Sequence, residues 1–361
     1  MTILGIAGTA KNTGKTTTLS ALLEEGRRRG VLPGLTGIGY DGEERDTVTN
    51  LPKPRLHVHP DMVVTTSERC LDVSSAHGEI LSRTGFRTPL GEVLILRITR
   101  AGLLVVAGPN KSAELSAVCA AMENAGAGVV FVDGSLNRIA PFSIAHAVVF
   151  ATGAARSTDP QVVRREILGI EAIFSFGKGT TEYFCRRGIR MMGKDVTVQL
   201  AGSSMHGPGE IAKAAAKRPE GFLSVEIPGV LTEAAFQELA RFAREGRFRG
   251  DLILDDPVKV LLGGDPSRMA RHLHVCATVG LRPLYRSRPS LCGITVNPSY
   301  PAFDGTIYTP ATVQAGAYVA GIRDGVGVRI FDLMGSGGAG ELLDLCLAGL
   351  GSQRASGKGS G

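Results

Sequence analysis

A glycine-rich segment near the start of the chain constrains the fold more than any other sequence feature. The apolar run Thr2–Ala7 predicts a buried strand, Gly8–Gly14 a loop, and Lys15–Arg29 an amphipathic helix, after which Leu35–Tyr40 predicts a second strand. A strand, a loop, a helix and a further strand in this order favour a parallel sheet, because the helix carries the chain back along the sheet.

The composition supports an α/β protein. Of the 361 residues, 43% are hydrophobic but only 5% are aromatic and none is Trp, so Val, Leu, Ile and Ala must build the core, as in parallel sheets covered by helices. We expect a doubly wound, mostly parallel sheet in a first domain over residues 1–160 and a second α/β domain over 161–350. The Gly/Ser-rich residues 351–361 predict a flexible tail.

Charge and cysteine usage exclude several classes of protein. The net charge of +6 is dispersed along the sequence, which argues against a nucleic-acid-binding surface. The six cysteines are far apart and form no C-x-x-C motif, which argues against both a disulfide framework and a zinc site. No basic leader or long apolar run is present, so we expect a cytoplasmic protein with no membrane contact.

The loop and the following helical turn have the residues of a phosphate-binding loop. Backbone N–H groups at a helix N-terminus bind anions, Lys15 is placed to reach the β- and γ-phosphates, and the Thr16 hydroxyl to bind Mg²⁺. The usual spacing puts glycine at position 9, where this chain has Thr9, so the motif is a variant. The candidate phosphate-binding residues are Gly8, Thr9, Asn12, Thr13, Gly14, Lys15, Thr16 and Thr17, with Lys11 as a further phosphate contact.

A magnesium site also needs a carboxylate from a neighbouring strand. Asp133 follows four apolar residues and is the first candidate; Asp41, after the strand Leu35–Tyr40, is the second, and a simple turn residue is an equal interpretation there. The candidate metal ligands are therefore Thr16, Asp41 and Asp133, and the candidate catalytic residues are Lys15, Asp133 and Lys11. Asn137 and Arg138 follow in the same loop as further phosphate contacts or as surface residues. We expect no other metal.

The nucleotide is expected to be ATP. The segment Asn110–Ala113 has the Asn-Lys pair of a guanine-reading loop but lacks its Asp, which favours ATP over GTP.

The six-residue interval from Gly8 to Gly14 resembles that of dethiobiotin synthetase and its relatives in the SIMIBI class of P-loop NTPases. Taken with other short stretches, the chain resembles the P-loop subunit of the lysine 5,6-aminomutase reactivase from residue 1 to about residue 335. The stretches that carry this resemblance are 8–18, Gly39–Glu43, Leu51–Arg55, Thr88–Glu92, Ala107–Pro109, Val132–Gly134 and Thr295–Pro298.

This resemblance implies an ATP-binding and ATP-hydrolysing factor that reactivates an adenosylcobalamin-dependent aminomutase of amino-acid fermentation. The partners would be the aminomutase, from which damaged cobalamin is released, and a second reactivase subunit. By the same resemblance Lys15 and Thr16 hold ATP and Mg²⁺, Asp41 and Asp133 lie around the metal, and Lys53 and Arg55 contact phosphate or a partner. Two alternatives remain: an ATP-dependent ligase or kinase of the dethiobiotin-synthetase type acting on a small molecule, and a GTP-using metallochaperone.

Overall fold

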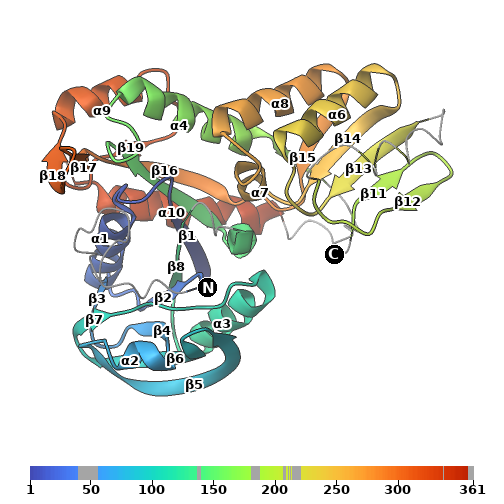
Figure 1. Ribbon diagram of the computed structural model, residues 1–361. Coiled ribbons are helices and arrows are strands. Elements are labelled where there is room, and N and C mark those ends of the chain that lie inside the picture. Colours follow the sequence, from blue (N-terminus) through green and yellow to red (C-terminus); the bar gives the residue numbers. More distant parts are fainter. Residues whose placement is uncertain are drawn as a thin grey trace. The chain divides into compact units, whose positions relative to one another are not determined.

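The chain folds into two compact units in the computed structural model, which describes residues 1–39, 56–135, 140–179, 188–205, 209, 211, 213, 221–335 and 337–356 (Figure 1). The first unit combines Met1–Arg164 with Ser290–Gly361, and the second is Arg165–Pro289.

The elements of the first unit are β1 (Thr2–Gly8), α1 (Lys15–Arg28), β2 (Pro33–Gly37), β3 (Leu56–Val58), β4 (Val63–Ser67), α2 (Glu68–Leu71), β5 (His77–Thr88), β6 (Gly91–Arg100), β7 (Gly102–Leu104), α3 (Ser112–Asn124), β8 (Val129–Ser135), η2 (Ala140–Ile144), β9 (Ala147–Gly153), β16 (Ser290–Asn297), β17 (Ser299–Phe303), β18 (Tyr308–Thr312), α9 (Ala315–Arg323), β19 (Ile330–Phe331) and α10 (Ala339–Ser356). The elements of the second unit are β10 (Gly177–Lys178), β11 (Arg190–Met192), β12 (Thr197–Gln199), β13 (Phe222–Ile227), α6 (Glu233–Arg244), β14 (Phe248–Leu254), α7 (Pro257–Leu261), α8 (Pro266–Thr278) and β15 (Leu281–Tyr285). Helix α4 (Pro160–Ser175) begins in the first unit and ends in the second.

A nine-stranded sheet organises the first unit, in the order β19-β16-β9-β1-β8-β2-β4-β6-β5. The strands from β19 to β4 are parallel, and β6 and β5 add an antiparallel hairpin at one edge. The N-terminal strand β1 lies in the middle of the parallel part, between β8 and β9. The loop that follows β1 therefore starts at the carboxyl edge of the sheet, where parallel α/β proteins bind ligands.

Both faces of β1 are buried, as the continuous apolar sequence predicts. Leu4 and Ile6 pack on one face in a cluster that includes Leu19 and Leu22 of α1 and Leu342 of α10. On the other face the Phe142 ring of η2 lies so close to Gly5 that a Cβ there would be 2.8 Å from the ring. The first unit is thus α/β with a mostly parallel sheet, compatible with a doubly wound fold.

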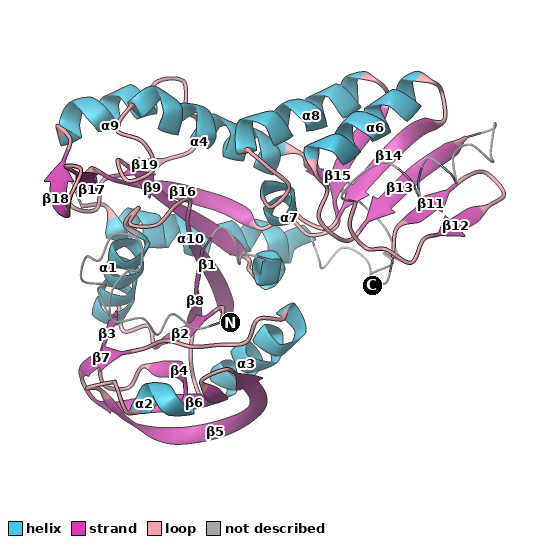
Figure 2. Cartoon of the chain, viewed as in Figure 1, coloured by secondary structure: helices cyan, strands magenta, loops and turns pink. Residues whose placement is uncertain are grey.

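The second unit has its own six-stranded sheet, in the order β10-β15-β14-β13-β11-β12. Strands β10, β15, β14 and β13 are parallel, and β11 pairs antiparallel with both of its neighbours, β13 and β12. Helices α6 and α8 lie side by side, with α6 against β14 and α8 against β15 (Figure 2).

The structure divides the chain differently from the expected domains 1–160 and 161–350. The second unit ends at Pro289, and the chain then returns to the first sheet as β16, which pairs with β9 in parallel. An apolar strand such as Gly293–Val296 fits either sheet, so its sequence alone does not assign it. The expected tail also differs, because α10 continues to Ser356; residues 357–361 lie outside the described residues.

Several strands also differ from expectation. The expected strand Leu35–Tyr40 corresponds to β2, which ends at Gly37. Strand β7 pairs with β3 in a separate two-stranded sheet. The hairpin of β5 and β6 was not expected from the repeated strand–helix pattern, because its strands are joined by a tight turn and not by a helix.

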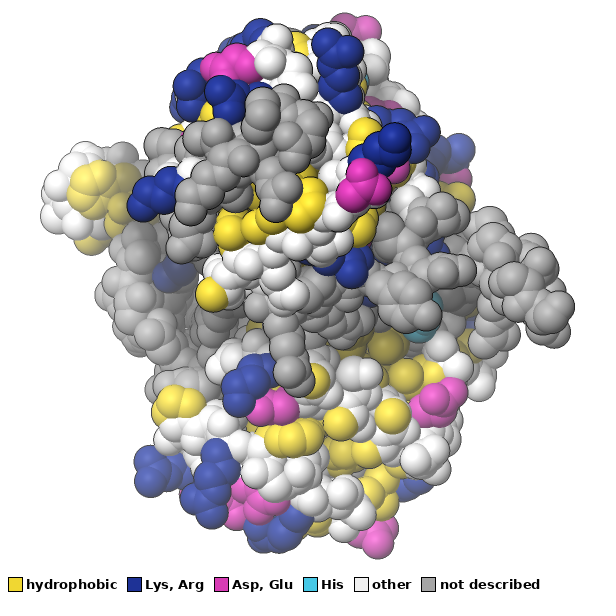
Figure 3. All heavy atoms as spheres, turned by 90° about the vertical axis from the view of Figure 1, so that its right-hand side faces the viewer, with side chains coloured by type: hydrophobic (Ala, Val, Ile, Leu, Met, Phe, Trp, Pro, Cys, Tyr) yellow, Lys and Arg dark blue, Asp and Glu magenta, His cyan; other side chains and the backbone are white. Residues whose placement is uncertain are grey.

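On the face shown in Figure 3, the described Lys and Arg side chains are interspersed with Asp and Glu, and form no continuous basic strip. Within the described ranges, no helix has the length and apolar character that crossing a membrane requires.

Candidate functional site

The segment between β1 and α1 folds into a compact loop. Asn12 and Gly14 have positive φ angles of 63° and 89°, and the Thr13 hydroxyl donates a hydrogen bond of 2.9 Å to the Ala10 carbonyl. Asparagine and glycine are the residues that adopt left-handed backbone most readily. The local sequence therefore supports the tight turn that leads into α1.

The first turn of α1 has properties that favour an anion. Gly14 is the N-cap residue, no side chain caps the helix, and the first turn contains no acidic residue. Uncapped N–H groups and the positive end of the helix dipole attract phosphate groups. Lys15, Thr16 and Thr17 form this turn and are partly buried, while Lys11 is exposed on the loop.

Lys15 lies against Asp133. Asp133 is near the end of β8, in register with Ile6 of β1, and its Oδ1 atom is 2.8 Å from the Lys15 ammonium. The two side chains are 22% and 19% exposed. Among the described residues this buried Oδ1 atom has no partner with hydrogen-bond alignment, and the ion pair with Lys15 compensates its charge. The structure therefore brings together two residues from segments more than a hundred positions apart in the sequence.

Thr9 occupies the position where the usual motif has glycine. Its N–H donates to the Ala151 carbonyl at 2.9 Å, and its hydroxyl donates to the Thr152 hydroxyl at 2.9 Å on the neighbouring strand β9. Its φ angle is not positive. Thr9 thus fastens the start of the loop to β9, and a glycine is not required here.

Two residues of β16 also contact this region, and the motif did not identify them. Thr295 and Thr18 share a hydrogen bond of 2.7 Å between their hydroxyls, and the Asn297 amide donates to the Asn12 carbonyl at 3.4 Å. Asn297 also lies so close to Gly14 that a Cβ on Gly14 would be 2.9 Å from the Asn297 Cβ. The only sequence signal for Asn297 was its place in the resemblance.

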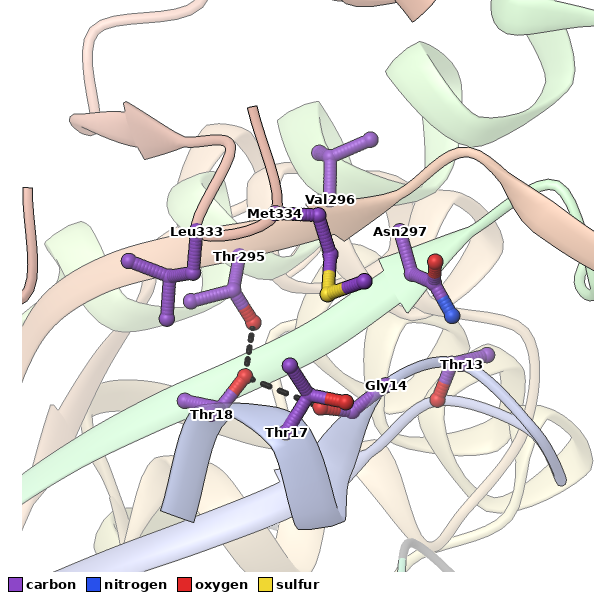
Figure 4. A pocket seen from close by; sticks show the side chains of 9 residues that line it. All are labelled: Thr13, Gly14, Thr17, Thr18, Thr295, Val296, Asn297, Leu333 and Met334. Atoms are coloured by element: carbon purple, nitrogen blue, oxygen red, sulfur yellow. Dashed lines mark hydrogen bonds between the residues drawn. The ribbon is translucent and has the colours of Figure 1, made fainter. Parts of the chain in front are cut away.

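A small pocket opens beside the loop (Figure 4). The start of α1, the end of β16 and the segment after β19 contribute its walls. The lining residues are Thr13, Gly14, Thr17, Thr18, Thr295, Val296, Asn297, Leu333 and Met334. The pocket therefore has hydroxyl and amide groups beside the loop and apolar side chains from the segment after β19.

Other sequence-predicted residues are not placed. Asp41, Lys53, Arg55, Asn137 and Arg138 lie outside the described residues. Among the residues that are described, no cluster of three or more His, Cys, Asp or Glu side chains has the geometry of a metal site. The candidate metal ligands that are described are Thr16, in the first turn of α1, and Asp133, in β8.

Comparison with protein families, curated proteins and solved structures finds no match for this chain.

Proposed function

We propose that this chain binds a nucleoside triphosphate with Mg²⁺ at residues 8–17 and hydrolyses it. The observation that carries the proposal is the Lys15 ammonium, held 2.8 Å from Asp133 beside an uncapped helix N-terminus at the carboxyl edge of the parallel sheet. A cation, free N–H groups and a carboxylate at one place are what binding of a metal–phosphate complex requires. These features support a fold of the P-loop NTPase type.

The residues divide the work of binding. The N–H groups of the loop and of the first turn of α1 donate to phosphate oxygens, and the loop has the left-handed turns at Asn12 and Gly14 that such a curved arrangement needs. Lys15 lies on a flexible stem, so phosphate oxygens can draw its ammonium away from Asp133. Lys15 then neutralises charge that develops on the phosphates during transfer.

The carboxylate and the hydroxyl suit Mg²⁺. This ion prefers oxygen ligands, keeps several waters, and when bound neutralises charge on the phosphates. Asp133 Oδ1 is buried without an aligned donor among the described residues, and so fits a metal-bound water once Lys15 has turned to phosphate. Thr16 adds a hydroxyl from the first turn of α1. The apolar Leu333 and Met334 offer a surface for a flat base beside the loop.

We propose further that the chain is part of a reactivating factor for an adenosylcobalamin-dependent aminomutase. The factor uses ATP and contains a second subunit. The support for this proposal is the resemblance of residues 1 to about 335 to the P-loop subunit of the lysine 5,6-aminomutase reactivase. Such a factor must bind the open aminomutase more tightly than the closed one, by about 5.5 kcal/mol to change a 1:99 population into 99:1. Switching between nucleotide states supplies a means to gain and then release that preference.

The test measures ATP hydrolysis with Mg²⁺, with and without an aminomutase that has been inactivated by turnover, and then aminomutase activity after fresh adenosylcobalamin is added. We expect ATP-dependent rescue that is lost in Lys15→Ala. The matched control is Lys111→Ala, which removes a lysine that is 79% exposed and pairs with Glu114.

Three outcomes would contradict the proposal at different levels. Failure of the wild-type protein to bind ATP or GTP would refute the nucleotide site. ATP consumption that occurs only with a small-molecule acceptor, without rescue in the presence of cell extract, would refute the reactivase and assign the ligase or kinase class. A competition experiment between ATP and GTP determines which base the site prefers. A preference for GTP would contradict the proposal that the nucleotide is ATP.

A further inference from the structure

Asn297 connects the loop of the proposed nucleotide site to a hairpin outside the main sheet. Its Nδ2 atom donates to the Asn12 carbonyl at 3.4 Å, and its Oδ1 atom accepts from the Ser299 backbone N–H at 3.0 Å. The two partners require this orientation of the amide, since one is an acceptor and the other a donor. One planar amide group therefore contacts the loop at one end and the first residue of β17 at the other.

The connection leaves little free space. A Cβ on Gly14 would be 2.9 Å from the Asn297 Cβ, so the backbone of the loop lies directly against this side chain. The Asn297 carbonyl accepts a hydrogen bond of 2.9 Å from the Ala154 N–H, which holds its backbone beside β9. A displacement of the loop is therefore taken up by the Asn297 side chain, because its backbone is held.

The hairpin consists of β17 and β18, which pair with each other in a two-stranded sheet separate from the nine-stranded one. At its base the Val313 N–H donates to the Pro298 carbonyl at 3.0 Å. At its tip Phe303 and Ile307 are 56% and 57% exposed, and the Phe303 ring lies 4.7 Å from the Tyr308 ring. The hairpin is thus an exposed element whose base adjoins Asn297.

We propose that Asn297 is a positioning residue that couples occupancy of the nucleotide site to the orientation of the β17–β18 hairpin. The inference rests on the proposed function and extends it. Phosphate oxygens bound to the N–H groups of residues 12–16 hold the loop in one conformation and so set the position of the Asn12 carbonyl. The bond of 3.4 Å from Asn297 is at the long limit for a hydrogen bond, so a small movement tightens or breaks it. Because the amide is planar, a rotation that follows Asn12 also moves the acceptor of the Ser299 N–H.

The chain contains no Trp, which makes a specific reporter available. Phe303→Trp places the sole Trp at the hairpin tip. The control Leu223→Trp places it in the second unit, at a side chain that is 58% exposed. With Mg²⁺ and ATP we expect a shift in the emission maximum or in acrylamide quenching for Phe303→Trp and none for Leu223→Trp. Calorimetric titration of each variant gives the ATP concentration that saturates it.

The role of Asn297 is tested in the Phe303→Trp background. Asn297→Ala removes both hydrogen bonds of the side-chain amide. Asn297→Asp keeps the acceptor for the Ser299 N–H and loses the donor to the Asn12 carbonyl. We expect both variants to lose the emission response at saturating ATP. A response to ATP like that of the parent in either variant would overturn the coupling through Asn297.

The outcomes separate this inference from the proposed function. Calorimetric binding of ATP with no emission change in Phe303→Trp overturns the coupling and leaves the nucleotide site intact. Absence of ATP binding in the parent overturns both. An equal emission change in Phe303→Trp and Leu223→Trp also overturns the coupling, since the change would then not be specific to the hairpin.

Discussion

Removing the Lys15 ammonium should destabilise the nucleotide-free protein through Asp133. The two charged atoms are 2.8 Å apart, and among the described residues the buried Asp133 Oδ1 atom has no partner with hydrogen-bond alignment. In Lys15→Met this carboxylate is left without a counter-charge. In Asp133→Asn the lysine loses its partner but can extend to water, so we expect a smaller loss of stability.

The distance and the burial set the expected magnitude. At 2.8 Å the Coulomb attraction is about 6 kcal/mol with an effective dielectric constant of 20, and desolvation of both groups offsets most of it. Exposed pairs contribute up to about 1 kcal/mol, whereas breaking a buried pair costs about 3–5 kcal/mol. With side chains 22% and 19% exposed, we expect a coupling free energy of about 2 kcal/mol.

A double-mutant cycle in urea measures this coupling. Lys15→Met, Asp133→Asn and the double variant are compared without nucleotide, using the unfolding transition of the first unit. We expect Lys15→Met to cost about 2 kcal/mol in the wild type and almost nothing in Asp133→Asn. The matched cycle uses Lys111→Met and Glu114→Gln, whose pair has a 79% exposed lysine, and should give less than about 0.5 kcal/mol. Additive effects of Lys15→Met and Asp133→Asn would refute the reasoning.

Three further predictions concern a buried carboxyl, a glycine and the cysteines. Burial, with Asp255 nearby, raises the pKa of Asp256 to about 7; because the folded protein keeps this proton to higher pH than the unfolded chain, stability falls as pH rises from about 4 to about 7. The effect of Asp256→Asn on the free energy of unfolding should therefore be more stabilising at pH 8 than at about pH 4, by up to roughly 4 kcal/mol. Denaturant unfolding at the two pH values measures this difference, and equal effects at both would contradict the prediction. Gly14→Ala should weaken ATP binding in calorimetry and destabilise the fold more than Gly30→Ala, because both have positive φ but only Gly14 lies against Asn297; equal losses of stability would argue against that contact. Burial raises the pKa values of Cys119 and Cys276 to about 12, so neither thiol should react with Ellman's reagent at pH 8 until the protein unfolds, as peptide mapping would show.

Much of the candidate site was accessible from local sequence. Gly8–Thr17 is one contiguous segment, and its glycines, its lysine and the neighbouring apolar run specify a strand, a tight loop and a helix through short-range effects. Asp133 was also accessible, because a carboxylate that directly follows an apolar run lies near the carboxyl end of the strand, and β8 ends two residues later at Ser135.

The partners that hold the loop were not accessible in this way. Thr152 of β9 and Asn297 of β16 contact the loop, and Thr295 of β16 contacts Thr18 in α1. Nothing in the neighbouring sequence of these residues indicates the contacts. Thr9 is an example. In the sequence it is a departure from the usual motif, and only the structure shows that its hydroxyl bonds to Thr152 on the neighbouring strand β9.

The amino-acid sequence alone thus indicated the α/β class and the order of β1, the loop and α1, since these depend on periodicity and on neighbours a few positions away, and it predicted a phosphate-binding role for residues 8–17. The tertiary structure decided that β16 returns to the first sheet, that Lys15 meets Asp133, and that Asn297 lies between the loop and the hairpin. Those features depend on which strands become neighbours and in which register, and an apolar strand buried on both faces carries no local signal for its partner.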